Sequence, residues 1–148
     1  MDNDALERAS LLATSVLVLA VLALLFLHDL LATGVPGLAV QGLAALLMLW
    51  ARLTLGRRSF HAAATPTAGG VIATGPYRYW RHPIYASILY FLWAGVASHR
   101  STLTVGLALL ASAALGARMV TEERLMAARY PDYAPYAART KRIIPFVV

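Results

Sequence analysis

Residues 9–27 read ASLLATSVLVLAVLALLFL, an apolar run without a charged side chain. As an α-helix this run is about 28 Å long, close to the thickness of the hydrocarbon core of a bilayer. Such a length and composition are typical of a membrane-spanning helix. The stretch therefore predicts that the chain is an integral membrane protein.

The overall composition indicates the same class. Of the 148 residues, 59% are hydrophobic and 14% are charged, against roughly 45–50% and about 25% in soluble domains. A soluble domain of this length has too little interior to bury so much apolar surface, and the same composition excludes a disordered chain. The chain has no cysteine, which excludes disulfides, thiolate metal sites and cysteine nucleophiles.

Three further apolar runs follow, and the last two are short for a membrane span. The last run reads as one helix over 102–120 if Arg118 faces inward. The run before it is expected at about 82–98, with a start as early as Tyr79 or Trp80. A polar helix over 122–130, opened or continued at Thr121, is expected after the last span and stops before Pro131. We predict an all-α membrane bundle in a single domain, 1–148, with spans at about 9–27, 35–51, 82–98 and 102–120.

The positive charges are distributed very unevenly over this arrangement. All but one of the 13 basic residues lie on one side, and only Arg100 lies in the hairpin between the last two spans. Because basic loops stay in the cytoplasm, both termini and the segments 52–81 and 121–148 are expected there, in a bacterial inner membrane. A net charge of +6 also suits nucleic acid, but in a membrane chain it favours anionic lipid. We expect the bilayer as partner and no nucleic acid; the pattern fixes no oligomeric state.

The densest cluster of functional side chains is GPYRYWRHPIY, residues 75–85. Pro83 in the first turn of a helix leaves nearby amides free to hold a carboxylate or phosphate, and His82 adds a hydrogen-bond donor. The alternative is an interfacial belt, in which Tyr and Trp lie at headgroup depth and Arg81 reaches lipid phosphates.

A second cluster lies where the last span ends. Arg118 and Glu122 are spaced i, i+4 and share one helix face. An ionisable residue in a span is a functional candidate: Arg118 suits a carboxylate, and Glu122 suits a cation or a hydroxyl. The alternative is a surface ion pair worth a few tenths of a kcal/mol. The tail that follows, with Tyr133 and Tyr136 among basic residues, is also typical of a segment lying on anionic lipid.

Other familiar sites are missing from the sequence. The four histidines have no metal-ligand spacing, so no metal is expected. We expect His28 to pair with Asp29 in a solvated loop and His99 to face solvent. No glycine-rich phosphate loop or Rossmann fingerprint is present.

Taken in order, the motifs closely resemble those of the isoprenylcysteine carboxyl methyltransferase family, and the related phospholipid methyltransferases share much of the pattern. The resemblance covers roughly residues 69–146. It implies a small helical membrane enzyme that binds S-adenosylmethionine without a Rossmann domain. The motifs are Gly75-Pro76-Tyr77, Arg81-His82-Pro83-Ile84-Tyr85, Glu122-Glu123, Tyr133, Tyr136, Arg139 and Ile144-Pro145-Phe146.

The resemblance also implies roles for single residues. It gives Arg118 and Glu122 as catalytic, with Arg118 on the substrate carboxylate. The implied cofactor-binding residues are Gly69, Gly70, Val71, Ile72, Tyr77, His82, Pro83, Ile84, Tyr85 and Glu122. Further pocket candidates are Arg81, Glu123, Tyr133, Tyr136 and Arg139.

The implied reaction is direct transfer of an activated methyl group to a carboxylate or other nucleophile of a lipophilic small-molecule acceptor. The protein then contributes positioning and desolvation. An amine acceptor would need a base, for which Glu122, Glu123 and Tyr85 are candidates. The first alternative is therefore a phospholipid N-methyltransferase. The others are a membrane reductase, whose NADPH phosphate would bind Arg139, Lys141 and Arg142, and a non-enzymatic module whose basic faces bind lipid.

Overall fold

The computed structural model describes residues 3–56 and 70–144. In these ranges the chain forms five α-helices and one 3-10 helix and no strand, which confirms the predicted all-α class. The elements are α1 (Asn3–Phe26), α2 (Val35–Leu55), η2 (Gly75–Arg78), α3 (Pro83–His99), α4 (Thr102–Arg129) and α5 (Tyr133–Arg139).

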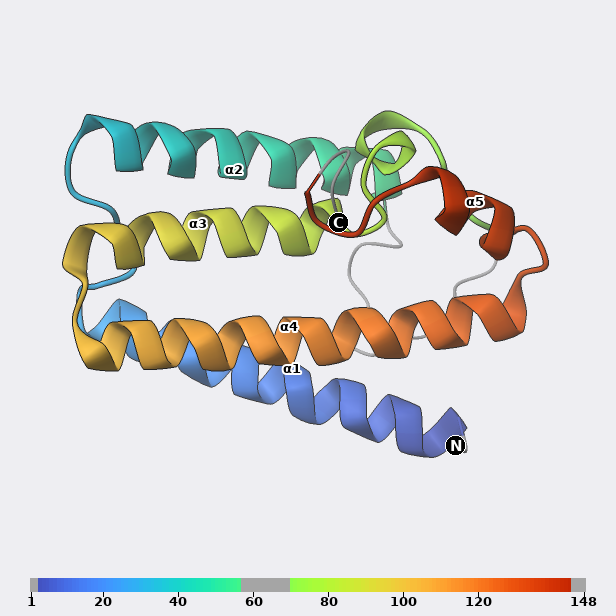
Figure 1. The fold of residues 1–148 in the computed structure, drawn as a ribbon, viewed down its shortest axis with the longest axis horizontal. Coiled ribbons are helices and arrows are strands. Elements are labelled where there is room, and N and C mark those ends of the chain that lie inside the picture. The colour runs from blue at the N-terminus through green and yellow to red at the C-terminus, as the bar shows by residue number, and fades with distance from the viewer. Residues whose placement is uncertain (1–2, 57–69, 145–148) are drawn as a thin grey trace.

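The four long helices run in alternating directions, as an up-and-down bundle (Figure 1). α1 packs mainly against α4, and α2 packs mainly against α3, while α3 and α4 join the two pairs. One end of the bundle carries η2 and α5 together with the end of α2 and the start of α3, and we call it the α5 end. The opposite end carries the two connections 27–34 and 100–101, and we call it the hairpin end.

Buried side chains recur along α1 and α4 at intervals close to one or two helical turns and form a seam between the two helices. Many of them are small, which allows two helices to approach closely in a membrane. Arg118 lies on this seam with only 6% of its surface exposed, so it does face inward. The buried seam residues are Leu6, Ser10, Ala13, Ala20 and Leu24 on α1, and Thr104, Ala108, Ala111, Leu115 and Arg118 on α4.

In the described ranges, three helices, α1, α2 and α4, are long and apolar enough to cross a membrane. α3 has 17 residues and is about 26 Å long, so the four-span topology and its orientation stay predictions. α4 does not break at Thr121, whose hydroxyl donates to the Ala117 carbonyl (2.9 Å). With 28 residues α4 is about 42 Å long, so its charged last turns extend beyond its apolar part.

The hairpin end is held by a polar network that the sequence did not indicate. Asp29 accepts a hydrogen bond from the buried Thr104 hydroxyl. The Nδ1 atom of His99 lies 3.3 Å from the Asp29 carboxylate, and its Nε2 atom lies 2.8 Å from the Leu31 carbonyl. The expectation that His99 faces solvent and that Asp29 belongs to His28 is therefore wrong, because the connection 27–34 packs against the end of α3 and the start of α4.

Candidate active site

The segment before α3 turns sharply at Gly75. This glycine has a φ of +55°, in the left-handed region that favours glycine. A Cβ atom here would also collide with the side chain of Thr54 near the end of α2. Gly75 thus lets η2 start directly against α2, and the chain then continues through Arg78 to His82 at the start of α3.

The C-terminal segment docks onto this turn. The amide of Arg81 donates to the Lys141 carbonyl (2.6 Å), and the amide of Lys141 donates to the Tyr79 carbonyl (3.1 Å). α5 buries Tyr133 and Tyr136, and the Tyr136 hydroxyl donates to the Tyr77 carbonyl (2.9 Å). The interpretation of this tail as a segment lying on lipid is therefore wrong for these two tyrosines, which pack into the protein.

Burial changes the pKa values of these tyrosines. It raises the pKa of Tyr136 to about 12, although Thr140 and Arg81 act in the opposite direction. Burial also raises the pKa values of Tyr77 and Tyr133. The Tyr136 phenol is therefore protonated at neutral pH and available as a donor to the Tyr77 carbonyl.

Glu123 anchors the C-terminal segment to the start of α3. Its carboxylate accepts hydrogen bonds from Arg81 Nε (3.0 Å) and Arg142 Nη2 (2.8 Å), and His82 Nε2 lies 3.2 Å away. Arg81 also donates to the carbonyl of Thr140 (2.8 Å). We call Arg81, His82, Glu123 and Arg142 the Glu123 anchor. Arg81 is thus held inside the protein, which overturns its interpretation as a side chain that reaches lipid phosphates.

A second group, which we call the Arg118 cluster, consists of Thr14, Tyr85, Arg118 and Glu122. Arg118 Nε donates to the Tyr85 hydroxyl (2.9 Å), and Arg118 Nη2 donates to Glu122 Oε1 (3.1 Å). The Tyr85 hydroxyl in turn donates to Glu122, and Arg118 Nη1 donates to the Thr14 hydroxyl. Three helices, α1, α3 and α4, therefore contribute to one buried polar cluster, and its members belong to one hydrogen-bond network.

His82 lies between the two groups. Its Nδ1 atom is 3.6 Å from Glu122 Oε2, and its Nε2 atom faces Glu123. The imidazole stacks on the Tyr85 ring with a centroid separation of 5.4 Å and an angle of 14° between planes. His82 therefore connects the Glu123 anchor, which holds the C-terminal segment, to Tyr85 and Glu122 of the Arg118 cluster.

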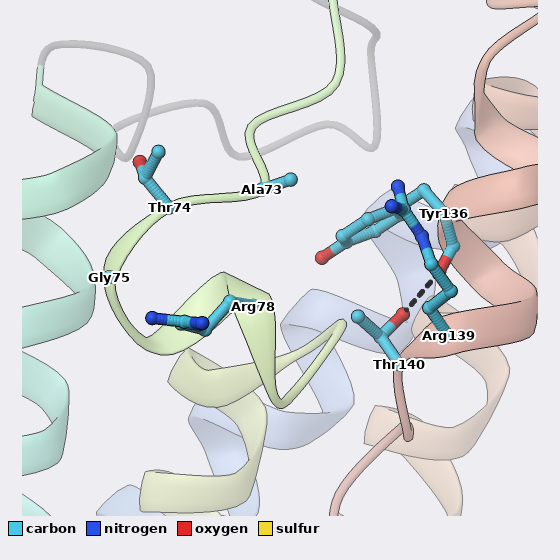
Figure 2. Close-up of a pocket in the computed structure, with 7 residues that line it drawn as sticks. All are labelled: Ala73, Thr74, Gly75, Arg78, Tyr136, Arg139 and Thr140. Carbon is cyan, nitrogen blue, oxygen red and sulfur yellow. Dashed lines mark hydrogen bonds between the residues drawn. The ribbon is translucent and has the colours of Figure 1, made fainter.

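A pocket of about 420 Å³ lies at the α5 end, between the segment that carries η2 and the helix α5 (Figure 2). Its volume lies in the range of small-molecule sites. Among the described residues, neither Arg78 nor Arg139 forms a salt bridge with an acidic side chain. Two cationic side chains in its lining make the pocket suited to an anionic ligand. It is lined by Ala73, Thr74, Gly75, Arg78, Tyr136, Arg139 and Thr140.

The structure brings most of the predicted site residues to the α5 end. Tyr85, Arg118 and Glu122 meet in the Arg118 cluster, while Tyr136 and Arg139 line the pocket. Gly69 lies outside the described residues. The remaining candidates flank these groups: Gly70, Val71 and Ile72 before η2, Tyr77 in η2, Arg81 and His82 before α3, Pro83 and Ile84 at its start, Glu123 on α4, and Tyr133 on α5.

Sequence reasoning missed several residues of this region. Thr14 lies in an apolar run, and nothing in the pattern pairs it with a residue 104 positions away. Arg78, although part of the quoted cluster, was not singled out as a pocket residue, and neither were Thr74 or Thr140. Within the described ranges, no three His, Cys, Asp or Glu side chains gather in a way that would hold a metal ion.

The sequence of the chain is similar to that of a known protein family. The family model of the isoprenylcysteine carboxyl methyltransferase (ICMT) family matches residues 37–128. This range contains Tyr85, Arg118 and Glu122. It excludes the whole of α1, which carries Thr14.

The chain is also 32% identical over 110 residues to the cobalt-zinc-cadmium resistance protein CzcN of Cupriavidus metallidurans. The alignment covers 74% of this chain and 47% of that protein, so the chain spans about half the length of this relative. No solved structure matches the chain. Since the family model covers more than half of the sequence, and the motifs it contains converge at the α5 end, the chain belongs to the isoprenylcysteine carboxyl methyltransferase family.

Proposed function

We propose that this membrane methyltransferase transfers the methyl group of S-adenosylmethionine to the carboxylate of a lipophilic acceptor. The observation that carries the proposal is the Arg118 cluster. A guanidinium that is buried between apolar helices is costly and is therefore a functional candidate. Guanidinium groups also bind carboxylates with high geometric specificity. Arg118 is thus the group best suited to hold an acceptor carboxylate.

The pocket between η2 and α5 has the chemistry that the cofactor requires. S-adenosylmethionine carries a carboxylate, an amino group and ribose hydroxyls. Arg139, beside Tyr136, would hold the carboxylate, and the hydroxyls of Thr74 and Thr140 would serve the polar groups. The backbone that forms one wall of the pocket continues from Arg78 to Tyr85, so the pocket and the Arg118 cluster share one segment of the chain.

The residues of the Arg118 cluster have different roles in the proposed methyl transfer. When bound, S-adenosylmethionine supplies a sulfonium-activated methyl group, which a carboxylate oxygen attacks directly to give a methyl ester and S-adenosylhomocysteine. Arg118 orients that carboxylate, while Tyr85 and Thr14 fix the guanidinium. Glu122 shares the charge of Arg118 at 3.1 Å, which keeps the ion pair with the acceptor weak enough for its oxygen to remain nucleophilic.

The same geometry favours a carboxylate over an amine as acceptor. A carboxylate has no proton to lose, whereas an amine needs a base. Glu123 is held by two arginines and His82, and Glu122 is bound to Arg118 and Tyr85. The reductase alternative is disfavoured for a related reason, because Arg142 pairs with Glu123 instead of joining Arg139 in a phosphate site.

A transfer assay tests the proposal. The purified chain in detergent is given S-adenosylmethionine labelled on the methyl group, with N-acetyl-S-farnesylcysteine as a lipophilic carboxylate and phosphatidylethanolamine as an amine. A methyl ester releases labelled methanol in base, so we expect base-labile label on the carboxylate acceptor.

Arg118→Ala should lower this activity by about 100-fold or more, with binding of S-adenosylhomocysteine retained. The matched control is Arg124→Ala, since Arg124 is exposed on the same helix. Base-stable label on the amine lipid, undiminished by Arg118→Ala, would contradict a carboxylate acceptor held by Arg118.

A further inference from the structure

Thr14 contributes to the site from a helix outside the range that the family model matches. Its hydroxyl accepts a hydrogen bond from Arg118 Nη1 and donates its own proton to the Ser10 carbonyl (2.7 Å). The bond to Ser10 fixes the hydroxyl rotor, so a lone pair of the oxygen points at the guanidinium. The side chain thus acts toward Arg118 as an oriented acceptor.

The packing of α1 on α4 sets this position. Ser10 and Ala13 are buried small residues on the α1 side of the seam, and Leu6 packs against Leu125 one turn further along. Because small residues let the two helices approach closely, the short side chain of Thr14 can reach Arg118. A hydroxyl is costly to bury unless it is hydrogen-bonded, and the partly buried Thr14 hydroxyl has both the Ser10 carbonyl and Arg118 as partners.

The charge of the partner matters as much as its position. Within the Arg118 cluster, Glu122 is an acid, whereas Thr14 and Tyr85 accept their hydrogen bonds from Arg118 as neutral hydroxyls. An acid at position 14 would place a second negative charge, in addition to that of Glu122, beside the guanidinium. This charge would compete with an incoming carboxylate. A neutral hydroxyl fixes the geometry of Arg118 and adds no negative charge beside the guanidinium.

We propose that Thr14 is a positioning residue for the acceptor: it holds Arg118 in the orientation that receives the acceptor carboxylate, and α1 is thereby part of the acceptor site. This inference rests on the proposed function, in which Arg118 holds the acceptor and the pocket beside α5 holds the cofactor. Thr14 therefore affects the acceptor without affecting the cofactor.

The test compares KM values for N-acetyl-S-farnesylcysteine and for S-adenosylmethionine in matched variants. Thr14→Val keeps the shape but removes the hydroxyl, and we expect it to raise the acceptor KM about tenfold while the cofactor KM stays within about twofold. Thr14→Ser keeps the hydroxyl and should restore the wild-type value. If Thr14→Val does not fold, Thr14→Ala removes the same hydroxyl without a branched side chain.

The control is Ser15→Ala. Ser15 makes the same type of bond to the carbonyl four residues earlier (3.1 Å) but is exposed, so its loss should leave both KM values unchanged. An unchanged acceptor KM in Thr14→Val, or an equal rise in both KM values, would overturn the role of Thr14 and leave the proposed function standing. If the wild-type chain transfers no methyl group to the carboxylate, the proposed function fails, and the role of Thr14 fails with it.

Discussion

Three buried tyrosines, Tyr77, Tyr133 and Tyr136, hold the C-terminal segment against the candidate site. In an unfolded chain their phenols ionise near pH 10, whereas burial raises the pKa of Tyr136 in the folded chain to about 12. Between these values the unfolded state has lost the Tyr136 proton and the folded state has kept it. The free energy of unfolding must therefore fall as the pH rises through this window.

This linkage predicts a specific response of Tyr136→Phe. The melting temperature of the wild-type chain in detergent should fall steeply from about pH 10 to 12, and that of Tyr136→Phe should fall less steeply, because phenylalanine has no proton to lose. Circular dichroism at a series of pH values measures both slopes. Tyr79→Phe, which changes an exposed tyrosine, should keep the wild-type slope. Equal slopes for all three proteins would show that Tyr136 does not carry the effect.

At the residue scale, the sequence predicted contacts within one element and missed those between elements. The spacing of Arg118 and Glu122 placed them on one helix face, and the structure joins them at 3.1 Å. The bonds from Arg118 to Tyr85 and Thr14 depend on how α1 and α3 pack on α4, which local spacing does not encode. For the same reason the sequence did not predict that His82 lies between two carboxylates.

At the scale of elements, Gly95 is a position where the backbone of the connection after α1 lies very close to the helix α3. The carbonyl groups of Asp29 and Leu30 pack so closely against this position of α3 that a Cβ atom would collide with them. Since both obstacles are backbone, they cannot rotate away. Gly95 is thus the point at which the connection after α1 rests on α3.

Gly95→Ala should therefore lower the free energy of unfolding by about 1–3 kcal/mol through overpacking. Gly106→Ala, on α4, is the matched control, because a Cβ atom there meets nothing within 4 Å. That variant should stabilise the helix by about 0.5–1 kcal/mol. Denaturant unfolding in detergent compares the two, and an equal effect of both changes would argue against contact between the connection and α3.

Helix boundaries were predictable where the chain marks them locally. Gly34 precedes α2 and Pro83 begins α3, as apolar runs bounded by glycine or proline predict. The docking of α5 was not predictable, because it depends on backbone hydrogen bonds between residues some 60 positions apart, such as Arg81 to Lys141. The network of Asp29, His99 and Thr104 was missed for the same reason.

At the scale of the whole molecule, the distribution of basic residues predicts the orientation in the membrane. Arg100 lies at the hairpin end, whereas Arg52, Arg78 and Arg142 lie at the α5 end. By the positive-inside rule, the α5 end should face the cytoplasm. The candidate site would then be open to a water-soluble cofactor on that side, and a lipophilic acceptor would enter from the bilayer.

Single-cysteine variants test this orientation cleanly, because the natural chain has no cysteine. Leu103→Cys lies at the hairpin end and Ala138→Cys lies in α5, and both positions are exposed. In intact bacterial spheroplasts, a membrane-impermeant maleimide should label the first variant and should label the second only after lysis. The reverse pattern would place the candidate site outside the cell and contradict the predicted topology.

The central claim is that the α5 end binds S-adenosylmethionine, and calorimetric titration with S-adenosylhomocysteine tests it without knowledge of the acceptor. We expect saturable binding to the wild-type chain in detergent, loss of that binding in Arg139→Ala, which removes a cation from the pocket lining, and no binding of NADPH. A folded chain that binds NADPH, or that binds neither molecule, would contradict the claim.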